Sequence, residues 1–305
     1  NFIKFLPDLI SICEQAAELQ IKYHKTKINI SRKYDGTPVT EIDIASSKII
    51  TTGLKSITPE IRVISEEYYS GVDASGYFWL VDPLDGTKNY INDGNQFCIN
   101  IALIKDNFPI LGLIYSPVTK DLYYAFKNFG SYYKKFNGEP VKIKTSKLTI
   151  EGIKNIYVST SIKNEIIKNL AENLSNVEII RYASALKFSF IAHGKGCFYP
   201  RIGPTHEWDT ASGQCIIEEA GGIVVDKFMK RLQYNKNSEY INKEFMDNVL
   251  EKIAQEYSKH KSQLNEIVDL SDKYDLSWAV FQINQMRNEE TYSDFIFDAK
   301  KIIMK

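Results

Sequence analysis

The chain has 305 residues, 44% of them hydrophobic, which is enough for one large folded domain or two ordinary ones. Its 38 basic and 38 acidic residues balance, so no overall charge favours nucleic acid or an anionic membrane as a partner. The apolar runs fall short of the ~20 residues of a membrane span. The four cysteines show no metal-ligand spacing and predict buried, reduced thiols of a cytoplasmic protein: Cys13, Cys98, Cys197 and Cys215.

The first half of the chain combines helices with a sheet. Apolar residues between Phe5 and Tyr23 recur at helical spacing and predict an amphipathic helix, and a second helix is expected at 41–54. Short connections between the following apolar runs favour antiparallel strands. These strands are expected at 61–64, 77–81, 97–104, 110–115 and 122–126.

The second half alternates strands with helices, which predicts a layered α/β arrangement. Strands are expected at 155–159, 177–181, 197–199 and 223–225, and helices at 164–173, 183–193 and 208–220. Beyond about Met246 the chain is rich in lysine, glutamate, glutamine and asparagine and lacks glycine and proline. We therefore expect a helical C-terminal extension.

The most informative stretch is residues 82–87, DPLDGT, which follows the predicted buried strand at 77–81. Burying Asp82 and Asp85 at a strand end is costly unless a cation meets them. A helix starting at Thr87 would leave backbone N–H groups free for an anion. Taken alone, the Asp-Gly pair is also typical of an ordinary turn.

Further acids could join this site. Glu66 and Glu67 follow the strand at 61–64, and Asp209 starts a predicted helix. Oxygen ligands without histidine or cysteine suit Mg2+ rather than zinc, and such a centre serves phosphate ester hydrolysis. Each acid also has an ordinary explanation, because adjacent glutamates are often solvated and aspartate favours helix N-termini.

Asp43 has a structural interpretation of its own. Thr40 and Asp43 have the spacing of a capping box at the start of the second helix, with aspartate in the usual position of glutamate. In that interpretation Asp43 only caps the helix.

Three motifs occur in the order found in one enzyme family: Glu66-Glu67, residues 82–87, and residues 208–213 (WDTASG) running into 219–222 (EAGG). With them, residues 1–246 resemble the Mg2+-dependent, lithium-sensitive phosphatases related to inositol monophosphatase. Within that family the chain is most similar to the bacterial 3'(2'),5'-bisphosphate nucleotidases. This similarity rests on residues 35–40 (DGTPVT), 199–205 (YPRIGPT) and 234–236 (YNK).

The resemblance implies a layered αβαβα sandwich of mixed α+β and α/β type, to which the helical extension is added. The chain then divides into an N-terminal α+β half at 1–145 with the metal motifs, a C-terminal α/β half at 146–246 with substrate contacts, and the extension at 247–305. Apolar residues of the extension, such as Trp278 and Phe281, are expected to pack on the same subunit or in a homodimer.

The resemblance also implies a set of metal ligands. Glu66, Asp82 and the Leu84 carbonyl would hold one Mg2+, and Asp82, Asp85 and Asp209 would hold a second. Two or three ions are expected in total.

The same resemblance assigns catalytic and substrate-binding residues. Asp43 and Thr87 would accept a proton from the attacking water, which gives Asp43 a second role beside capping, and Glu66 would also take part in catalysis. Lys187 would supply a point charge for a second phosphate. The expected substrate contacts are Gly86, Thr87, Lys88, Ser184, Lys187 and Asp209.

One segment departs from the nucleotidases. Related enzymes often carry Arg-Ser-His after the strand that corresponds to residues 157–159, where this chain has Thr160, Ser161 and Ile162. A basic contact to the nucleotide is therefore missing, although the metal motifs are complete.

We accordingly expect a cytoplasmic, Mg2+-dependent phosphatase that hydrolyses the 3'-phosphate of adenosine 3',5'-bisphosphate to AMP and phosphate. The alternatives are an inositol or sugar monophosphatase and, outside the enzymes, a nucleotide sensor with a low-turnover site. The expected partner is a small phosphate ester, with no nucleic acid and no membrane span.

Overall fold

The computed structural model describes residues 2–34, 36–69, 76–146, 155–164, 178–196, 198–226, 230–236, 239–242 and 276–281. Its helical segments are η1 (Phe2–Phe5), α1 (Leu6–Tyr23), α2 (Glu41–Ile57), α3 (Thr87–Ile91), α5 (Leu186–Ala192), η3 (Glu207–Asp209) and α6 (Ala211–Glu219). The first strands are β1 (Ile30–Arg32), β2 (Pro38–Thr40), β3 (Arg62–Ser65), β4 (Tyr77–Asp85), β5 (Cys98–Lys105), β6 (Phe108–Ser116) and β7 (Asp121–Phe126). The later strands are β8 (Gly130–Lys134), β9 (Val141–Ile143), β10 (Asn155–Ser159), β11 (Glu178–Tyr182), β12 (Phe198–Ile202), β13 (Ile223–Asp226) and β14 (Leu276–Phe281).

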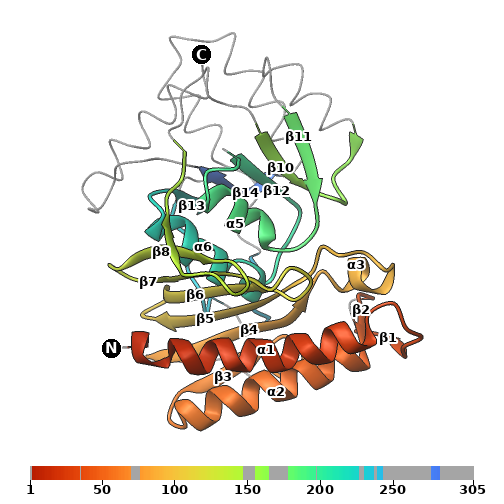
Figure 1. Cartoon of the computed structure of the whole chain (residues 1–305). Coiled ribbons are helices and arrows are strands. Elements are labelled where there is room, and N and C mark those ends of the chain that lie inside the picture. Colours follow the sequence, from red (N-terminus) through yellow and green to blue (C-terminus); the bar gives the residue numbers. More distant parts are fainter. Residues whose placement is uncertain are drawn as a thin grey trace, which may run out of the picture.

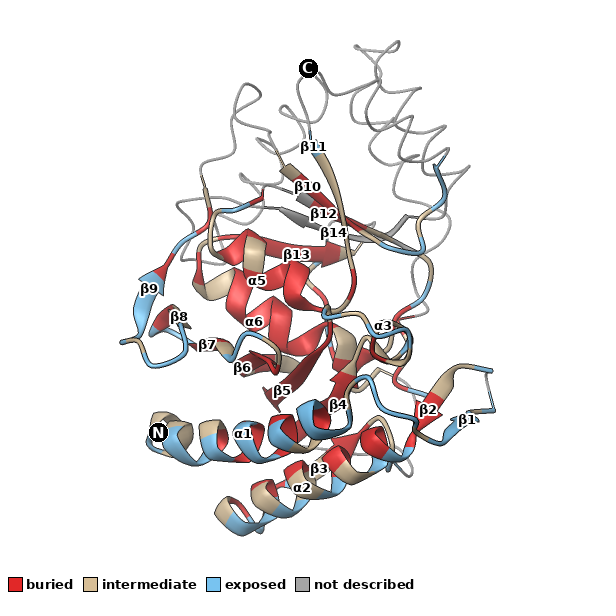
Figure 2. Cartoon of the chain, turned by 45° about the vertical axis from the view of Figure 1, so that its right-hand side comes forward, coloured by how far each residue is buried: buried red, intermediate tan, exposed pale blue. Residues whose placement is uncertain are grey.

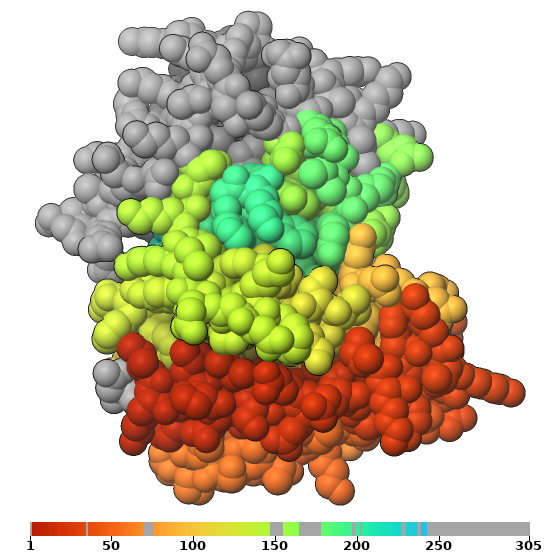
Figure 3. Space-filling model, viewed as in Figure 1, coloured from red at the N-terminus to blue at the C-terminus, as the bar shows by residue number. Residues whose placement is uncertain are grey.

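Helices and sheets alternate in layers (Figure 1). A seven-stranded sheet has the order β3-β4-β5-β6-β7-β8-β9, and a five-stranded sheet has the order β11-β10-β12-β14-β13. The helices α1 and α2 cover one face of the larger sheet as a continuous band (Figure 3), and α5 and α6 lie between the two sheets (Figure 1). The layered sandwich is therefore confirmed, while most of the helix predicted at 164–173 lies outside the described residues.

Burial on both faces explains the continuous apolar run of β4. Phe78 and Leu80 belong to the core that the larger sheet shares with α5 and α6, whereas Trp79 and Val81 belong to the core under α1 and α2. Because side chains alternate along a strand, a central strand between two helix layers must be apolar at every position. Figure 2 shows this buried interior continuing through the sheet into α5 and α6.

The prediction of buried, unpaired thiols is confirmed for the described cysteines. Cys13, Cys98 and Cys215 are buried free thiols, and Cys197 lies outside the described residues.

The C-terminal extension contains a strand. Residues 276–281 form β14, which pairs antiparallel with β12 on one side and β13 on the other. The helix predicted throughout 247–305 is therefore wrong at these residues, and its remainder lies outside the described ranges. A segment without glycine or proline suits a strand as well as a helix, and the hydrogen bonds of two neighbouring strands decide between them.

Candidate metal centre

A bulge in β4 brings Asp82 and Asp85 to the same face of the sheet. In a regular strand, residues three apart point to opposite faces. Here Asp82 lies opposite Asn100 and Asp85 lies opposite Cys98 on β5, so β4 contains one residue more than its partner. This extra residue lets both carboxylates reach one site.

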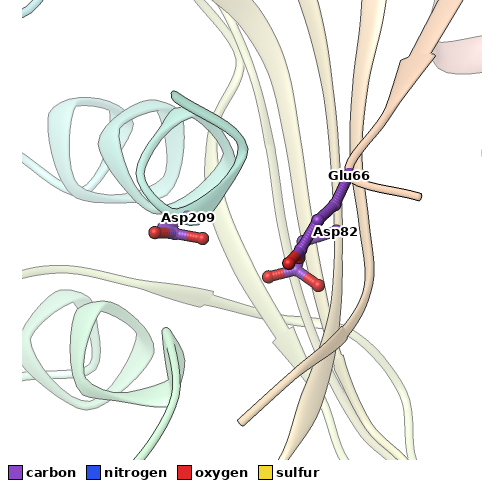
Figure 4. A group of neighbouring side chains, drawn as sticks. All are labelled: Glu66, Asp82 and Asp209. Carbon is purple, nitrogen blue, oxygen red and sulfur yellow. The ribbon is translucent and has the colours of Figure 1, made fainter. Parts of the chain in front are cut away.

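Three carboxylates from separate parts of the chain meet at this bulge. Glu66 follows β3, Asp82 is on β4 and Asp209 is in η3, and one oxygen of each lies within 4.8 Å of the other two. The parallel pairing of β3 with β4 brings Glu66 and Asp82 to the same edge of the sheet. Figure 4 shows Asp209 approaching them from the other side of the site.

Burial and mutual repulsion disfavour the charged forms of these acids. Burial, with the charges of Glu66 and Asp85, raises the pKa of Asp82 well above its ordinary value. Burial, with the charges of Asp85 and Glu66, raises the pKa of Asp209 to about 8. An ionised cluster of this kind needs a cation to compensate it. The oxygen-only donor set fits a hard divalent cation such as Mg2+.

Lys33 follows β1 and reaches the same cluster, a contact that the sequence did not predict. Its Nζ lies 2.5 Å from Glu66 Oε1 and 2.8 Å from Glu67 Oε1. Burial alone would lower the pKa of Lys33, but the two carboxylates outweigh burial and raise it. The Glu67 side chain is only 6% exposed, so the interpretation of this residue as half of a solvated pair is wrong.

Asp43 and Thr87 form a hydrogen-bonded pair. Thr87 Oγ1 lies 2.9 Å from Asp43 Oδ1, to which it donates, and 3.1 Å from the Leu84 carbonyl oxygen. The predicted capping box is confirmed as well, because Asp43 Oδ2 accepts from the Thr40 backbone N–H at 2.8 Å and the Thr40 hydroxyl caps the start of α2. The two interpretations of Asp43 are therefore geometrically compatible, since they use different oxygens.

Gly86 shapes the approach to α3. It has a φ of 96°, and a Cβ there would lie 2.9 Å from the Gln96 carbonyl oxygen, so the position favours glycine on both grounds. Thr87 begins α3 and Lys88 is exposed. The first N–H groups of this helix have no acceptor within the helix itself.

Donors from two other elements hold Asp85. Its Oδ2 accepts a short hydrogen bond from the Ala185 N–H and a second one from Asn100 Nδ2 at 3.3 Å. Burial raises the pKa of Asp85, and the charge of Lys187 is the strongest opposing influence. Asp85 thereby connects the bulge to the segment that contains Ser184 and Lys187.

Lys187 lies near the acids, but its ammonium contacts backbone carbonyls. Nζ donates to the Tyr182 carbonyl at 3.0 Å and to the Ser184 carbonyl, and it lies 4.8 Å from the centre of the Tyr199 ring. The residue is 3% exposed, and burial lowers its pKa to about 8. Ser184 has a φ of 60°, so it forms a tight turn before α5. Substrate contacts of Ser184 and Lys187 stay predictions.

Two arginines near this region were not predicted. Arg181 on β11 donates to the carbonyls of Thr160 and Ile162, both at 2.9 Å, and so holds the segment that departs from the nucleotidases. Arg201 on β12 is close enough to lower the pKa of Lys187 and to oppose the raised pKa of Asp209. Arg201 lies within the YPRIGPT segment, which was the available sequence signal.

Comparison with known proteins identifies the family. A model described as the inositol monophosphatase family matches residues 5–269. The 3'(2'),5'-bisphosphate nucleotidase CysQ of Buchnera aphidicola is 37% identical over 254 residues, which cover 81% of this chain and 94% of the relative. The CysQ protein of Aggregatibacter actinomycetemcomitans is 35% identical over 246 residues, which cover 79% of this chain and 91% of the relative.

Solved structures share the fold. CysQ from Bacteroides thetaiotaomicron has a TM-score of 0.66 at 24% identity, covering 91% of this chain and 97% of that chain. The Thermotoga maritima IMPase has a TM-score of 0.68 at 22% identity, covering 87% and 96%. Among the residues that the structure describes, no helix has the length and apolar character to cross a membrane. The chain belongs to the inositol monophosphatase family.

Proposed function

We propose that this protein is an Mg2+-dependent 3'(2'),5'-bisphosphate nucleotidase that hydrolyses adenosine 3',5'-bisphosphate to AMP and phosphate. The observation that carries the proposal is the convergence of Glu66, Asp82 and Asp209 within 4.8 Å beside the Asp43–Thr87 pair. The names of the relatives that are 35% and 37% identical support the substrate class. A cytoplasmic location and a homodimer stay predictions from the sequence.

The proposed ligands divide between two ions. Glu66, Asp82 and the Leu84 carbonyl would hold one Mg2+, and Asp82, Asp85 and Asp209 would hold another. Bound Mg2+ would stabilise negative charge on the phosphate and lower the pKa of a water molecule. The raised pKa values of Asp82 and Asp209 support this assignment, because burial and mutual repulsion disfavour their charged forms and a bound cation would relieve both effects.

The Asp43–Thr87 pair would handle the proton. As the water oxygen bonds to phosphorus and the bond to the 3' oxygen breaks, the water proton would pass to the Thr87 hydroxyl while the hydroxyl proton passes to Asp43, and the departing 3' oxygen would take up a proton from solvent. The 2.9 Å hydrogen bond between Thr87 and Asp43 supports this direction of transfer. Burial raises the pKa of Asp43, which improves it as a proton acceptor.

The substrate would lie between the start of α3 and the α5 side of the site. The Gly86 and Thr87 N–H groups, with Lys88, would bind the phosphate that is removed. Ser184, Lys187 and Arg201 would face the second phosphate. Lys187 would then exchange a backbone carbonyl for a phosphate oxygen, which is a favourable exchange for a buried ammonium.

Phosphate release tests this proposal. Adenosine 3',5'-bisphosphate and inositol 1-phosphate are compared by kcat/KM, with Mg2+ and with a chelator, in the wild type and in Asp85→Asn. We expect Mg2+-dependent release, preference for the bisphosphate, and nearly complete loss in Asp85→Asn. Preference for the inositol ester would favour the monophosphatase alternative. Nucleotide and Mg2+ binding without release would favour the sensor.

A further inference from the structure

The bulge that carries the candidate ligands has backbone groups outside the sheet ladder. Pairing between β4 and β5 is interrupted between Asp82 and Asp85, so Pro83 and Leu84 have no paired partner on β5. Both residues are buried, and buried backbone groups need hydrogen-bond partners. Side chains therefore have to satisfy this turn.

Each backbone group of the two bulged residues has such a partner. The Leu84 N–H donates to Asp82 Oδ1 at 3.1 Å, and the Leu84 carbonyl lies 3.1 Å from the Thr87 hydroxyl, whose single proton it shares with Asp43. Proline has no N–H, so the Pro83 carbonyl is the remaining backbone group that needs a partner. It accepts from Gln20 Nε2 at 2.7 Å, across 63 positions of sequence. Gln20 is the one partner in this set that lies outside residues 82–87.

The orientation of the Gln20 amide is fixed by its neighbours. The Pro83 carbonyl can only accept, so the amide nitrogen must face it. The same nitrogen donates to Ser46 Oγ at 3.1 Å. Gln20 is fully buried, and within the described part of the chain its Oε1 has no hydrogen-bond partner. An unsatisfied buried acceptor is unfavourable, so packing alone does not explain a glutamine at position 20.

The last turn of α1 contacts the bulge and the segment that follows it. The Tyr90 hydroxyl on α3 donates to the Gln20 backbone carbonyl at 2.7 Å. The His24 ring lies 5.2 Å from the Tyr90 ring, and its Nε2 lies 2.9 Å from the Gly94 carbonyl. In Figure 1 the C-terminal end of α1 reaches the side of the molecule where α3 lies. A rigid helix thus holds residues 83–94 at three points.

We propose that Gln20 is a positioning residue for the metal ligands. By fixing the Pro83 carbonyl, it would set the path of the bulge and so the directions of Asp82, the Leu84 carbonyl and Asp85. The inference rests on the proposed Mg2+ site. Removing a hydrogen bond to a metal ligand itself lowers metal affinity by about 10- to 100-fold. Gln20 acts on Pro83, which lies between the ligands, so we expect the lower end of that range.

Mg2+ binding measured by calorimetry tests this inference directly, alongside the Mg2+ dependence of phosphate release. In Gln20→Met, which keeps the volume and removes the donor, we expect the Mg2+ dissociation constant to rise by about 10-fold. The kcat at saturating Mg2+ should change far less. Should Gln20→Met fail to fold, Gln20→Asn makes the same test, because its shorter amide withdraws from Pro83.

Two control variants separate positioning from general stability. Ser46→Ala removes the other hydrogen-bond partner of the Gln20 amide and leaves the Pro83 contact. Cys13→Ala opens a small cavity in the same buried face of α1. Both should keep the wild-type Mg2+ dissociation constant, even where the melting temperature falls.

The outcomes distinguish this inference from the proposed function. Wild-type Mg2+ binding with an unchanged constant in Gln20→Met would overturn the positioning role alone. An equal rise in Cys13→Ala would also overturn it, because the effect would follow from stability. Absence of Mg2+ binding in the wild type would overturn both proposals.

Discussion

Replacing Asp43 with asparagine separates its two roles. One oxygen accepts from the Thr40 backbone and the other from the Thr87 hydroxyl. Asparagine retains one acceptor oxygen but cannot take up a proton near neutral pH. Loss of a general base typically lowers rates by about 100- to 10,000-fold. Loss of a cap interaction costs about 1 kcal/mol, which corresponds to a fall of about 1–2 °C in melting temperature for a chain of this size.

Thr40→Ala provides the matched control. It removes the hydroxyl that caps α2 and that also donates to Asp43 Oδ2, while the Thr40 N–H and the Asp43–Thr87 hydrogen bond remain available. We expect both variants to lose similar stability and only Asp43→Asn to lose most of its kcat at saturating Mg2+ and substrate. Thermal unfolding and steady-state phosphate release measure the two effects. Near wild-type kcat in a destabilised Asp43→Asn would show that Asp43 only caps the helix.

Three further predictions follow from charge and burial. Lys187→Met should reduce kcat/KM for adenosine 3',5'-bisphosphate far more than for a monophosphate ester, and equal losses would contradict a contact to the second phosphate. Asp209 has a pKa raised from 3.8 to about 8, so the folded, metal-free protein binds more protons than the unfolded chain across this range. Its contribution to stability is then present at acidic pH and lost as the pH rises toward about 8. Melting temperatures in a chelator should decline over that range and Mg2+ should offset the decline, whereas a rise with pH would refute the assignment. Glu219→Ala should lower the free energy of unfolding by about 1 kcal/mol without changing kcat. The Glu219 carboxylate accepts hydrogen bonds from the Asn128 and Gly130 N–H groups, which lie far in the sequence from the proposed metal ligands. Lost activity with a normal melting temperature would contradict this prediction.

Strand β4 and the start of helix α2 could be predicted from the sequence, because short local patterns identify both. The apolar run of β4 results from burial on both faces, and the Thr40–Asp43 spacing identifies the start of α2. The DPLDGT motif predicted a strand end and a turn. It could not reveal that one inserted residue turns Asp82 and Asp85 to the same face, because that depends on the register with β5.

Contacts between segments that are distant in the sequence could not be predicted from it. Lys33 reaches Glu66 and Glu67 from the β1–β2 hairpin, whose DGTPVT segment indicated a family resemblance but not this contact. Gln20 reaches Pro83 from a helix that was predicted only as amphipathic. β14 shows the same limit, because its neighbours in the sheet, β12 and β13, come from far earlier in the chain. In each case tertiary contacts, rather than local propensity, decide the role of the residue.

Lys33 also accounts for the adjacent pair of glutamates. Only Glu66 belongs to the group of three carboxylates, whereas Glu67 holds the Lys33 ammonium at 2.8 Å. In the proposed function, Glu66 has to exchange that ammonium for an ion. Glu67 would retain Lys33 during the exchange, so a partly buried ammonium would not be left without a counter-charge. Burial and the charge of Glu66 raise the pKa of Glu67 to about 7, and compensation of Glu66 by an ion would remove part of that repulsion. In the proposed function the two glutamates would therefore have different roles: Glu66 would bind the ion, and Glu67 would keep Lys33 in place.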